Sequence, residues 1–151
     1  MKITAQEEYG LRILLRIARG SECDGMTIPD ISAAEGLSQA NVAKLCRILR
    51  MAGFISSSRG KTGGYTLSRP ADEIQLSEVL HSLGGKLYDP EFCGSHAGIN
   101  NMCQNAGSCA IQPLWHLLQK SIDKILGDLT LTDLLEMSES IYRHHETQVE
   151  N

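Results

Sequence analysis

The sequence lacks any long apolar run. No stretch approaches the roughly 18 consecutive apolar residues that a membrane-spanning helix requires. Glu7 and Glu8 lie where a signal peptide would carry its apolar region. The chain also lacks the phosphate-binding loop, the dinucleotide fingerprint and the nucleophile elbow of common enzyme classes. We therefore expect a cytoplasmic protein that has no membrane partner and is not an enzyme.

Acidic residues are absent from residues 36–71, although the 151-residue chain has a net charge of −4. This window contains six basic side chains: Lys44, Arg47, Arg50, Arg59, Lys61 and Arg69. Residues 86–151 are net acidic, with nine acidic residues against four basic ones. The asymmetry favours one face that binds a polyanion such as DNA, and a merely solvated basic face is the alternative.

The first helix is predicted over about residues 5–19. Thr4 and Glu7 form a capping-box pattern, in which each side chain reaches a backbone amide of the other. An apolar stripe at helical spacing follows: Leu11, Leu14, Leu15 and Ala18. We expect this stripe to face the core.

Two shorter helices are predicted next, joined by a turn at Gly36. Thr27 and Ser38 are their N-cap candidates. The inward face of the second contains these residues: Val42, Leu45, Cys46, Leu49 and Ala52. Residues 54–58 and 65–67 predict short strands around a glycine-rich turn. The whole is typical of a winged helix-turn-helix.

The second of these helices has polar and basic residues opposite its apolar face. Gln39 and Asn41 carry amides that can pair with adenine, and Lys44 can reach guanine or phosphate. Arginines further along suit phosphate contacts, and an arginine on the wing turn can enter a narrow minor groove. The predicted DNA-contacting residues are Ser38, Gln39, Asn41, Lys44, Arg47, Arg50, Arg59 and Lys61.

Three of the five cysteines lie in a loop with few apolar residues. Cys93, Cys103 and Cys109 are separated by nine and five residues, which matches neither a zinc finger nor the ferredoxin spacings. Three thiolates on a glycine-rich loop can hold an iron–sulfur cluster. A zinc site, a disulfide switch and idle thiols are open alternatives.

The order of these features resembles that of the Rrf-type winged-helix transcription regulators, which include IscR-like and NsrR-like proteins. The resemblance covers the chain to about residue 135. It rests on GLS at 36–38, SSSRGKTGGYTLSRP at 56–70 and CAIQPLW at 109–115, which runs into a long helix. It implies a transcription regulator of mainly α structure with a small β-wing.

The resemblance further implies a homodimer, crossed through the long helix after the loop, that binds a palindromic operator in double-stranded DNA. It implies that Cys93, Cys103 and Cys109 hold a 2Fe–2S or 4Fe–4S cluster whose state changes the affinity for DNA. A regulator of the same fold that senses oxidants through bare thiols is the main alternative. A small electron-transfer protein is the second.

The chain differs from the IscR-like proteins that it resembles in the residue available as fourth cluster ligand. IscR-like proteins have a histidine three residues after the last cysteine, whereas this chain has Gln112. NsrR-like members use a carboxylate early in the partner's first helix, and Glu8 has the matching position. We therefore expect Glu8 of the partner subunit as fourth ligand, with His96 and Gln112 as rivals. A surface ion pair between Glu8 and Arg12 is the alternative role.

Four regions are expected from these features. Residues 1–84 form the winged helix-turn-helix domain, and 85–110 form the cysteine-bearing cluster loop. Residues 111–145 contain the dimerisation helix and a C-terminal helix capped by Thr130 or Thr132, and 146–151 are a disordered tail.

Overall fold

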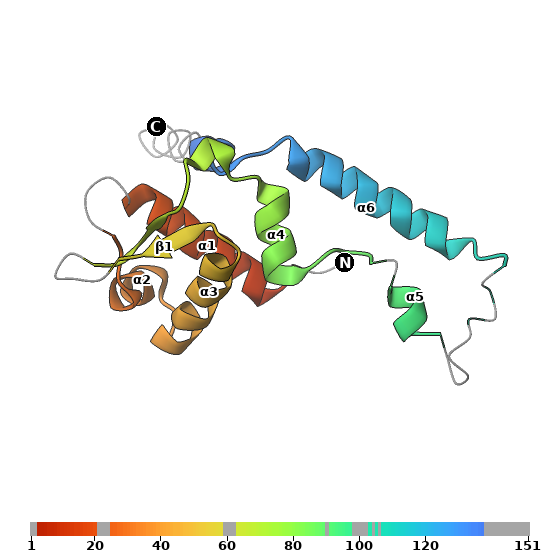
Figure 1. Cartoon of the computed structure of the whole chain (residues 1–151), viewed down its shortest axis with the longest axis horizontal. Coiled ribbons are helices and arrows are strands. Elements are labelled where there is room, and N and C mark those ends of the chain that lie inside the picture. Colours follow the sequence, from red (N-terminus) through yellow and green to blue (C-terminus); the bar gives the residue numbers. More distant parts are fainter. Residues whose placement is uncertain are drawn as a thin grey trace, which may run out of the picture.

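A computed structural model describes the following residues of the chain: 3–20, 25–58, 63–89, 91–97, 103, 105 and 107–137. Its elements are α1 (Ala5–Gly20), α2 (Ile28–Glu35), α3 (Gln39–Met51), β1 (Ile55–Ser57), β2 (Tyr65–Leu67), the 3-10 turn η1 (Ala71–Glu73), α4 (Leu76–Gly84), α5 (Phe92–Ser95) and α6 (Ile111–Gly127). The predicted class is confirmed, since helices surround one small antiparallel sheet (Figure 1). None of the helices within these ranges has the length and apolar character needed to cross a bilayer.

Local capping bonds set the ends of the first helices. Before α1, the amide and hydroxyl of Thr4 each donate to Glu7 Oε2 at 2.7 Å, which completes the predicted capping box. Thr27 caps α2 together with Asp30, and α2 ends at Gly36, whose φ of 66° is left-handed. The helix-turn-helix pair is therefore built largely by bonds between residues close in sequence.

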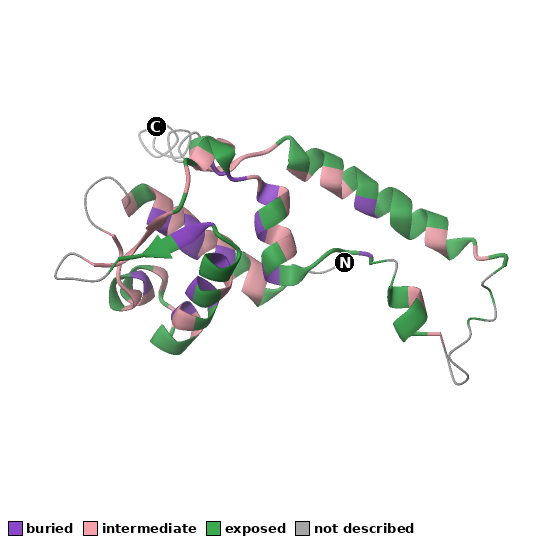
Figure 2. Cartoon of the chain, viewed as in Figure 1, coloured by how far each residue is buried: buried purple, intermediate pink, exposed green. Residues whose placement is uncertain are grey.

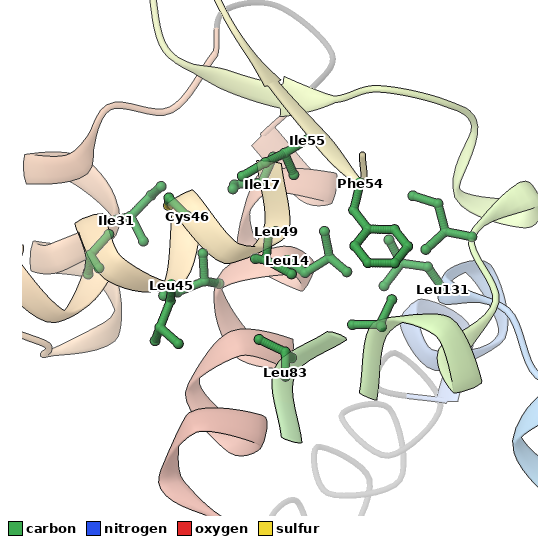
Figure 3. Close-up of a cluster of buried hydrophobic side chains, with 14 of the residues drawn as sticks. Leu14, Ile17, Ile31, Leu45, Cys46, Leu49, Phe54, Ile55, Leu83 and Leu131 are labelled. Carbon is green, nitrogen blue, oxygen red and sulfur yellow. The ribbon is translucent and has the colours of Figure 1, made fainter. Parts of the chain in front are cut away.

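The core lies between α1, α3, α4 and the small sheet (Figure 3). The face that α1 buries consists of Gly10, Ile13, Leu14 and Ile17. The predicted stripe does face the core, since Leu14 is fully buried and Leu11, Leu15 and Ala18 are partly buried and pack against the core. The sequence did not predict that Gly10 is buried: a Cβ there would lie 2.4 Å from Leu83 Cδ2 of α4, so the glycine permits the close approach of the two helices. The prediction that Ala52 faces inward was wrong, because α3 has already ended at Met51 and Ala52 is exposed.

The chain returns to this core after α6. Leu76 N–H donates to Leu129 O at 3.0 Å, and Leu131 N–H donates to Ile74 O at 2.9 Å. Thr130 and Asp133 form a capping box before residues 131–137, which are helical. The rest of the predicted final helix lies outside the described residues. Leu131 is fully buried beside the other core side chains (Figure 3), so the start of the predicted C-terminal helix packs in the winged-helix core.

Helix α6 differs from every other long helix of the described chain because almost all of it is exposed (Figure 2). It packs against α4 and otherwise extends away from the core (Figure 1). Its large exposed apolar residues are Ile111, Leu114, Trp115, Leu117, Leu118 and Ile125. The single residue that α6 buries is polar, Gln119.

Candidate nucleic-acid interface and cysteine site

Helix α3 presents the predicted major-groove residues on its outer face. The Ser38 hydroxyl accepts the Asn41 amide at 3.3 Å and thereby caps the helix. Gln39 is exposed and Asn41 is partly buried. The basic residues Lys44, Arg47 and Arg50 of the same helix are exposed as well. The structure thus brings these six residues together on one helix, although their contact with DNA stays a prediction.

Lys44 and Arg47 also line a hollow of about 580 Å³ between α3 and α4. The other lining residues are Ile48, Met51, Ala52 and Ser82. Because Ser82 belongs to α4, a shift of α4 along this hollow would alter the surroundings of two predicted phosphate-binding side chains.

The wing hairpin is held at its base. Ile55 pairs with Leu67 in the sheet, and Ser58 N–H donates to Gly64 O at 3.0 Å. Gly64 lies against Gly25, since a Cβ on Gly64 would be 2.4 Å from backbone atoms of Gly25. The predicted minor-groove residues Arg59 and Lys61 fall outside the described residues, so their role also stays a prediction.

Arg69, the last basic residue of the acid-free window, is held by its own chain. Its Nη2 lies 2.6 Å from Glu78 Oε2, and its guanidinium lies 5.6 Å from the centre of the Phe54 ring. The charge count over residues 36–71 therefore overstates the cations available to DNA by one.

A buried carboxylate fastens α1 to the end of α2. Glu35 accepts from Arg12 Nε at 2.9 Å and from Arg16 Nε at 2.7 Å, and its backbone carbonyl accepts from Arg12 Nη2 at 2.9 Å. Burial alone raises the pKa of Glu35, but the hydrogen bonds and charges of Arg16 and Arg12 outweigh it and lower that pKa. Arg12 is thus engaged by Glu35, and the alternative Glu8–Arg12 ion pair does not form among the described residues.

One of the three loop cysteines contacts a buried tyrosine. Tyr88 is 6% exposed, and its hydroxyl lies 3.4 Å from the sulfur of Cys93, which belongs to the short helix α5. The sulfur of Cys109 accepts the backbone amide of Gln112 at 3.4 Å at the start of α6. The hydrogen bond to Cys93, burial and the thiol charges raise the pKa of Tyr88, and the side chain of Gln112 opposes this change. Tyr88 therefore stays protonated at physiological pH, and either its hydroxyl or the Cys93 thiol can donate in this contact.

The donor chemistry of the loop fits an iron–sulfur group, since three thiols are the soft ligands that iron–sulfur clusters use. Cys93 and Cys109 are partly buried, whereas Cys103 is exposed. Over the part of the chain that the structure describes, no three metal-binding side chains converge. In contrast, Cys46 is buried in the core, and burial raises its pKa to about 11, as expected of the small core side chain that the sequence predicted.

The three candidates for a fourth ligand have different surroundings. Glu8 is exposed on α1 and lines a groove of about 870 Å³ that α4 and α6 also border. His96 stacks on Phe92, with ring centres 4.1 Å apart, and its Nδ1 lies 3.0 Å from Phe92 O. Gln112 lies beside the Tyr88 hydroxyl. Of the three, Glu8 alone lies on the winged-helix core.

Sequence reasoning missed Tyr88 and the residues that support it. Gln119 Oε1 accepts the Tyr88 amide at 2.9 Å, and Gln119 Nε2 donates to Asp123 Oδ1 at 2.7 Å. The ring of His116 meets Tyr88 edge-on at 4.9 Å. A polar row at helical spacing on α6 could have indicated this contact: Gln112, His116, Gln119 and Asp123.

The fold, together with the exposed polar and basic face of α3, the predicted DNA-recognition helix, defines a winged-helix transcription regulator. The chain belongs to the Rrf2 family, described as "Iron-dependent Transcriptional regulator", which matches residues 3–137. The resemblance found in the sequence is thereby confirmed. Members of this family are regulators of transcription and not enzymes, as the sequence also predicted.

Two curated relatives align over nearly the whole chain. Protein rrf2 of Nitratidesulfovibrio vulgaris is 33% identical over 135 residues, which cover 89% of this chain and 87% of the relative. The HTH-type transcriptional regulator IscR of Klebsiella pneumoniae is 30% identical over 153 residues, covering 98% and 91%.

Solved structures with a similar fold include two kinds of regulator. IscR of T. potens has a TM-score of 0.73 at 25% identity, covering 93% of this chain and 90% of that one. CymR, the global cysteine regulator of B. subtilis, has a TM-score of 0.72 at 26% identity, covering 91% and 98%. The oxidised form of Staphylococcus aureus CymR has a TM-score of 0.68 at 27% identity, covering 90% and 97%.

Proposed function

We propose that this protein is a homodimeric transcription regulator whose affinity for its operator is controlled by an iron–sulfur cluster on the three-cysteine loop. The observation that carries the proposal is the three-cysteine loop, whose Cys93 contacts the buried Tyr88, in a chain of an iron-dependent regulator family. Bound by Cys93, Cys103 and Cys109, the cluster would supply iron whose redox state or loss changes the order of the loop. As a regulator of chromosomal genes, the protein would act in the cytoplasm.

The DNA side of the proposal rests on α3 and the wing. Gln39 and Asn41 would read base edges in the major groove, and Lys44 would reach guanine or phosphate. The other proposed contacts are Ser38, Arg47, Arg50 and the wing residues Arg59 and Lys61. A regulator with two such helices would bind half-sites about one helical turn, ~34 Å, apart on a palindromic operator.

The dimer is proposed to form through α6. Ile111, Leu117 and Ile125 of this helix are 60%, 62% and 63% exposed. Apolar side chains in such number along one helix are typical of a surface that a second chain covers. A second copy crossing α6 would bury them and bring the cysteine loop of one protomer toward the core of the other.

Glu8 of the partner subunit is the proposed fourth ligand. Within the described residues its carboxylate has no ion pair, since Arg12 is held by Glu35. Glu8 lines the same groove as Ile122 and Ile125 of α6, so a partner helix lying along that groove would pass close to it. A carboxylate exchanges more readily than a thiolate, which suits a site that must release or open its cluster.

A cluster-free regulator that senses oxidants through its thiols is the second candidate. The three free thiols of the loop favour it, because two thiols that come together can be oxidised to a disulfide. The fold similarity to the oxidised form of S. aureus CymR supports the comparison.

The deciding experiment is purification without oxygen, followed by an absorption spectrum and measurement of iron and acid-labile sulfide. We expect a coloured protein with iron and sulfide in equal amounts. A colourless protein without sulfide that forms a Cys93–Cys109 disulfide on oxidation would replace the first candidate by the second.

Binding to a palindromic duplex tests the class itself. If about six phosphates are contacted, the logarithm of the binding constant should fall against the logarithm of salt with a slope of about −5. A slope near zero would contradict DNA binding through the basic residues of α3 and the wing.

The ligand assignment is tested by a set of three variants prepared anaerobically. Glu8→Ala should shift the cluster spectrum and shorten its lifetime in air, whereas His96→Ala and Gln112→Ala should not. If Glu8→Ala matches the unmodified protein and one of the other variants loses its cluster, that residue takes the place of Glu8.

A further inference from the structure

Tyr88 is held from two sides. Its hydroxyl contacts the sulfur of Cys93, and its backbone amide donates to Gln119 Oε1 of α6. Its ring also lies against His116. Since the residue is 6% exposed and lies between the end of α4 and the start of α5, it connects the cysteine loop to the helical part of the protein.

A series of polar contacts connects Tyr88 to α4. Gln119 uses both ends of its buried side-chain amide, since its Nε2 donates to Asp123 at 2.7 Å. The same Asp123 oxygen lies 3.2 Å from Nε2 of His81 on α4. A row of bonded groups therefore runs from Cys93 through Tyr88, Gln119 and Asp123 to α4.

Helix α4 in turn contacts the recognition helix. It packs against α1 and α3, and Ser82, the neighbour of His81, lines the hollow that Lys44 and Arg47 also line. A displacement of α4 at this level would change the position of α3 relative to the rest of the winged helix.

We propose that Tyr88 and Gln119 are positioning residues that couple the state of Cys93 to α4, and through α4 to the recognition helix of the same protomer. This inference rests on the proposed function, since it requires that the state of the loop alters operator affinity. A metal-bound thiolate carries negative charge and accepts a hydrogen bond from the Tyr88 hydroxyl more strongly than a neutral thiol or a disulfide sulfur does. When the sulfur changes state, this bond changes in strength, and Tyr88 transmits the change to Gln119 because its amide is bonded there.

Such coupling within one chain differs from a cluster that merely ties two protomers together. It requires an element with two arrangements that both sites influence, and α4 with its link to Gln119 is that element. The Tyr88–Gln119 contact would otherwise be purely structural, in which case its loss would weaken the fold equally in every state of the loop.

The test uses the full-length dimer in two states: purified anaerobically, and after removal of iron by a chelator under reducing conditions. The operator affinity of each state gives a ratio, and hydrogen exchange over residues 80–88 gives a second readout. In the unmodified protein we expect a ratio well above one and an exchange difference between the states. A ratio of one in the unmodified protein would contradict the proposed function and not this inference alone.

Gln119→Leu is the principal variant because it leaves the cysteines and the Tyr88 hydroxyl in place. We expect it to load iron and sulfide normally, while its affinity ratio falls by about fivefold, the value of one ordinary hydrogen bond. The exchange difference over residues 80–88 should disappear. Tyr88→Phe, which removes only the hydroxyl, should lower the ratio in the same way.

Ser95→Ala is the matched control. Ser95 lies in the same loop, but its hydroxyl bonds only to residues within or next to α5, so its removal should leave the ratio unchanged. The inference is overturned if Gln119→Leu loads its cluster and keeps the ratio and the exchange difference of the unmodified protein. It is also overturned if Ser95→Ala lowers the ratio as much as Gln119→Leu does.

Discussion

The winged-helix core buries its large apolar side chains, whereas the region of α6 and the cysteine loop leaves many of them exposed. In the core, Ile13, Leu14 and Ile17 of α1 are 0% exposed. In α6, by contrast, most residues are exposed (Figure 2), and the apolar side chain of Leu117 is 62% exposed. Both helices have the apolar spacing of a packed face, so the difference lies in what is available to cover them. The core is completed by its own chain, whereas α6 presents a face that the described part of this chain leaves uncovered.

The polar groups differ in the same way. In the core, Glu35 satisfies two arginines and both ends of α2 are capped. In the loop region, Cys103 is exposed and Glu8, on the neighbouring groove, is unpaired among the described residues. A region whose polar and apolar groups lack partners within one protomer is suited to receive them from a second protomer or a ligand.

The largest expected effect comes from removing the same side chain in each region. Leu45→Ala, in a site 1% exposed, should lower the free energy of unfolding by about 2–5 kcal/mol. Leu117 is 62% exposed, so Leu117→Ala should weaken only the proposed dimer. The resulting fall in the thermal midpoint should therefore depend on protein concentration. Urea unfolding and sedimentation at several concentrations measure both. A concentration-independent loss for Leu117→Ala would mean that this side chain is buried inside the protomer.

A smaller effect is expected from neutralising either of two carboxylates that form ion pairs, Glu35 or Glu78. Glu35→Gln should cost about 2 kcal/mol, because Glu35 is largely buried and accepts charged hydrogen bonds from two arginines. Glu78→Gln, which removes the exposed pair with Arg69, should cost under about 1 kcal/mol.

At acidic pH, the difference in stability between the unmodified protein and Glu35→Gln should disappear. The pKa of Glu35 is lowered from its ordinary value of 4.5 in the folded protein. Its stabilisation is therefore fully present above pH 4.5 and is lost as the pH falls through the folded-state pKa. Unfolding curves of the unmodified protein and Glu35→Gln should converge in that range. Equal curves at pH 7 would contradict the role given to this carboxylate.

The smallest expected effect compares two glycines with open space around them. Gly36 has a φ of 66°, so Gly36→Ala should destabilise the protein by about 1 kcal/mol through backbone strain alone. Gly94 lies in α5 without a positive φ, so Gly94→Ala should be neutral or stabilising by less than about 1 kcal/mol. Thermal unfolding measures both. A destabilising Gly94→Ala would show that the loop needs a glycine at that position.

Short-range features were predictable from the sequence. The caps at Thr4, Thr27 and Ser38 were predicted correctly, because each bond joins residues three positions apart. The two short strands were also found where the pattern placed them, on either side of a glycine-rich turn. The helical turn α5 was not predicted, because four residues are too few for a periodic pattern.

Contacts between distant segments were not predictable. The buried face of α1 depends on how closely Gly10 approaches Leu83, and hydrophobicity alone does not report that distance. From the sequence, Arg69 counts among the basic residues of the acid-free window, but the structure shows that it forms an ion pair with Glu78. The return of Leu131 to the core likewise requires knowledge of where α6 ends in space.

The sequence by itself determined the class of protein, the helix-turn-helix with its caps, and the three thiols as candidate ligands. These follow from local bonding and from the chemistry of side chains, which do not depend on distant parts of the chain. The tertiary structure alone decided that Tyr88 meets Cys93 and that Gln119, across 31 residues of sequence, holds Tyr88. A buried amide needs a partner wherever the fold provides one, so such contacts are set by packing and leave little trace in the order of residues.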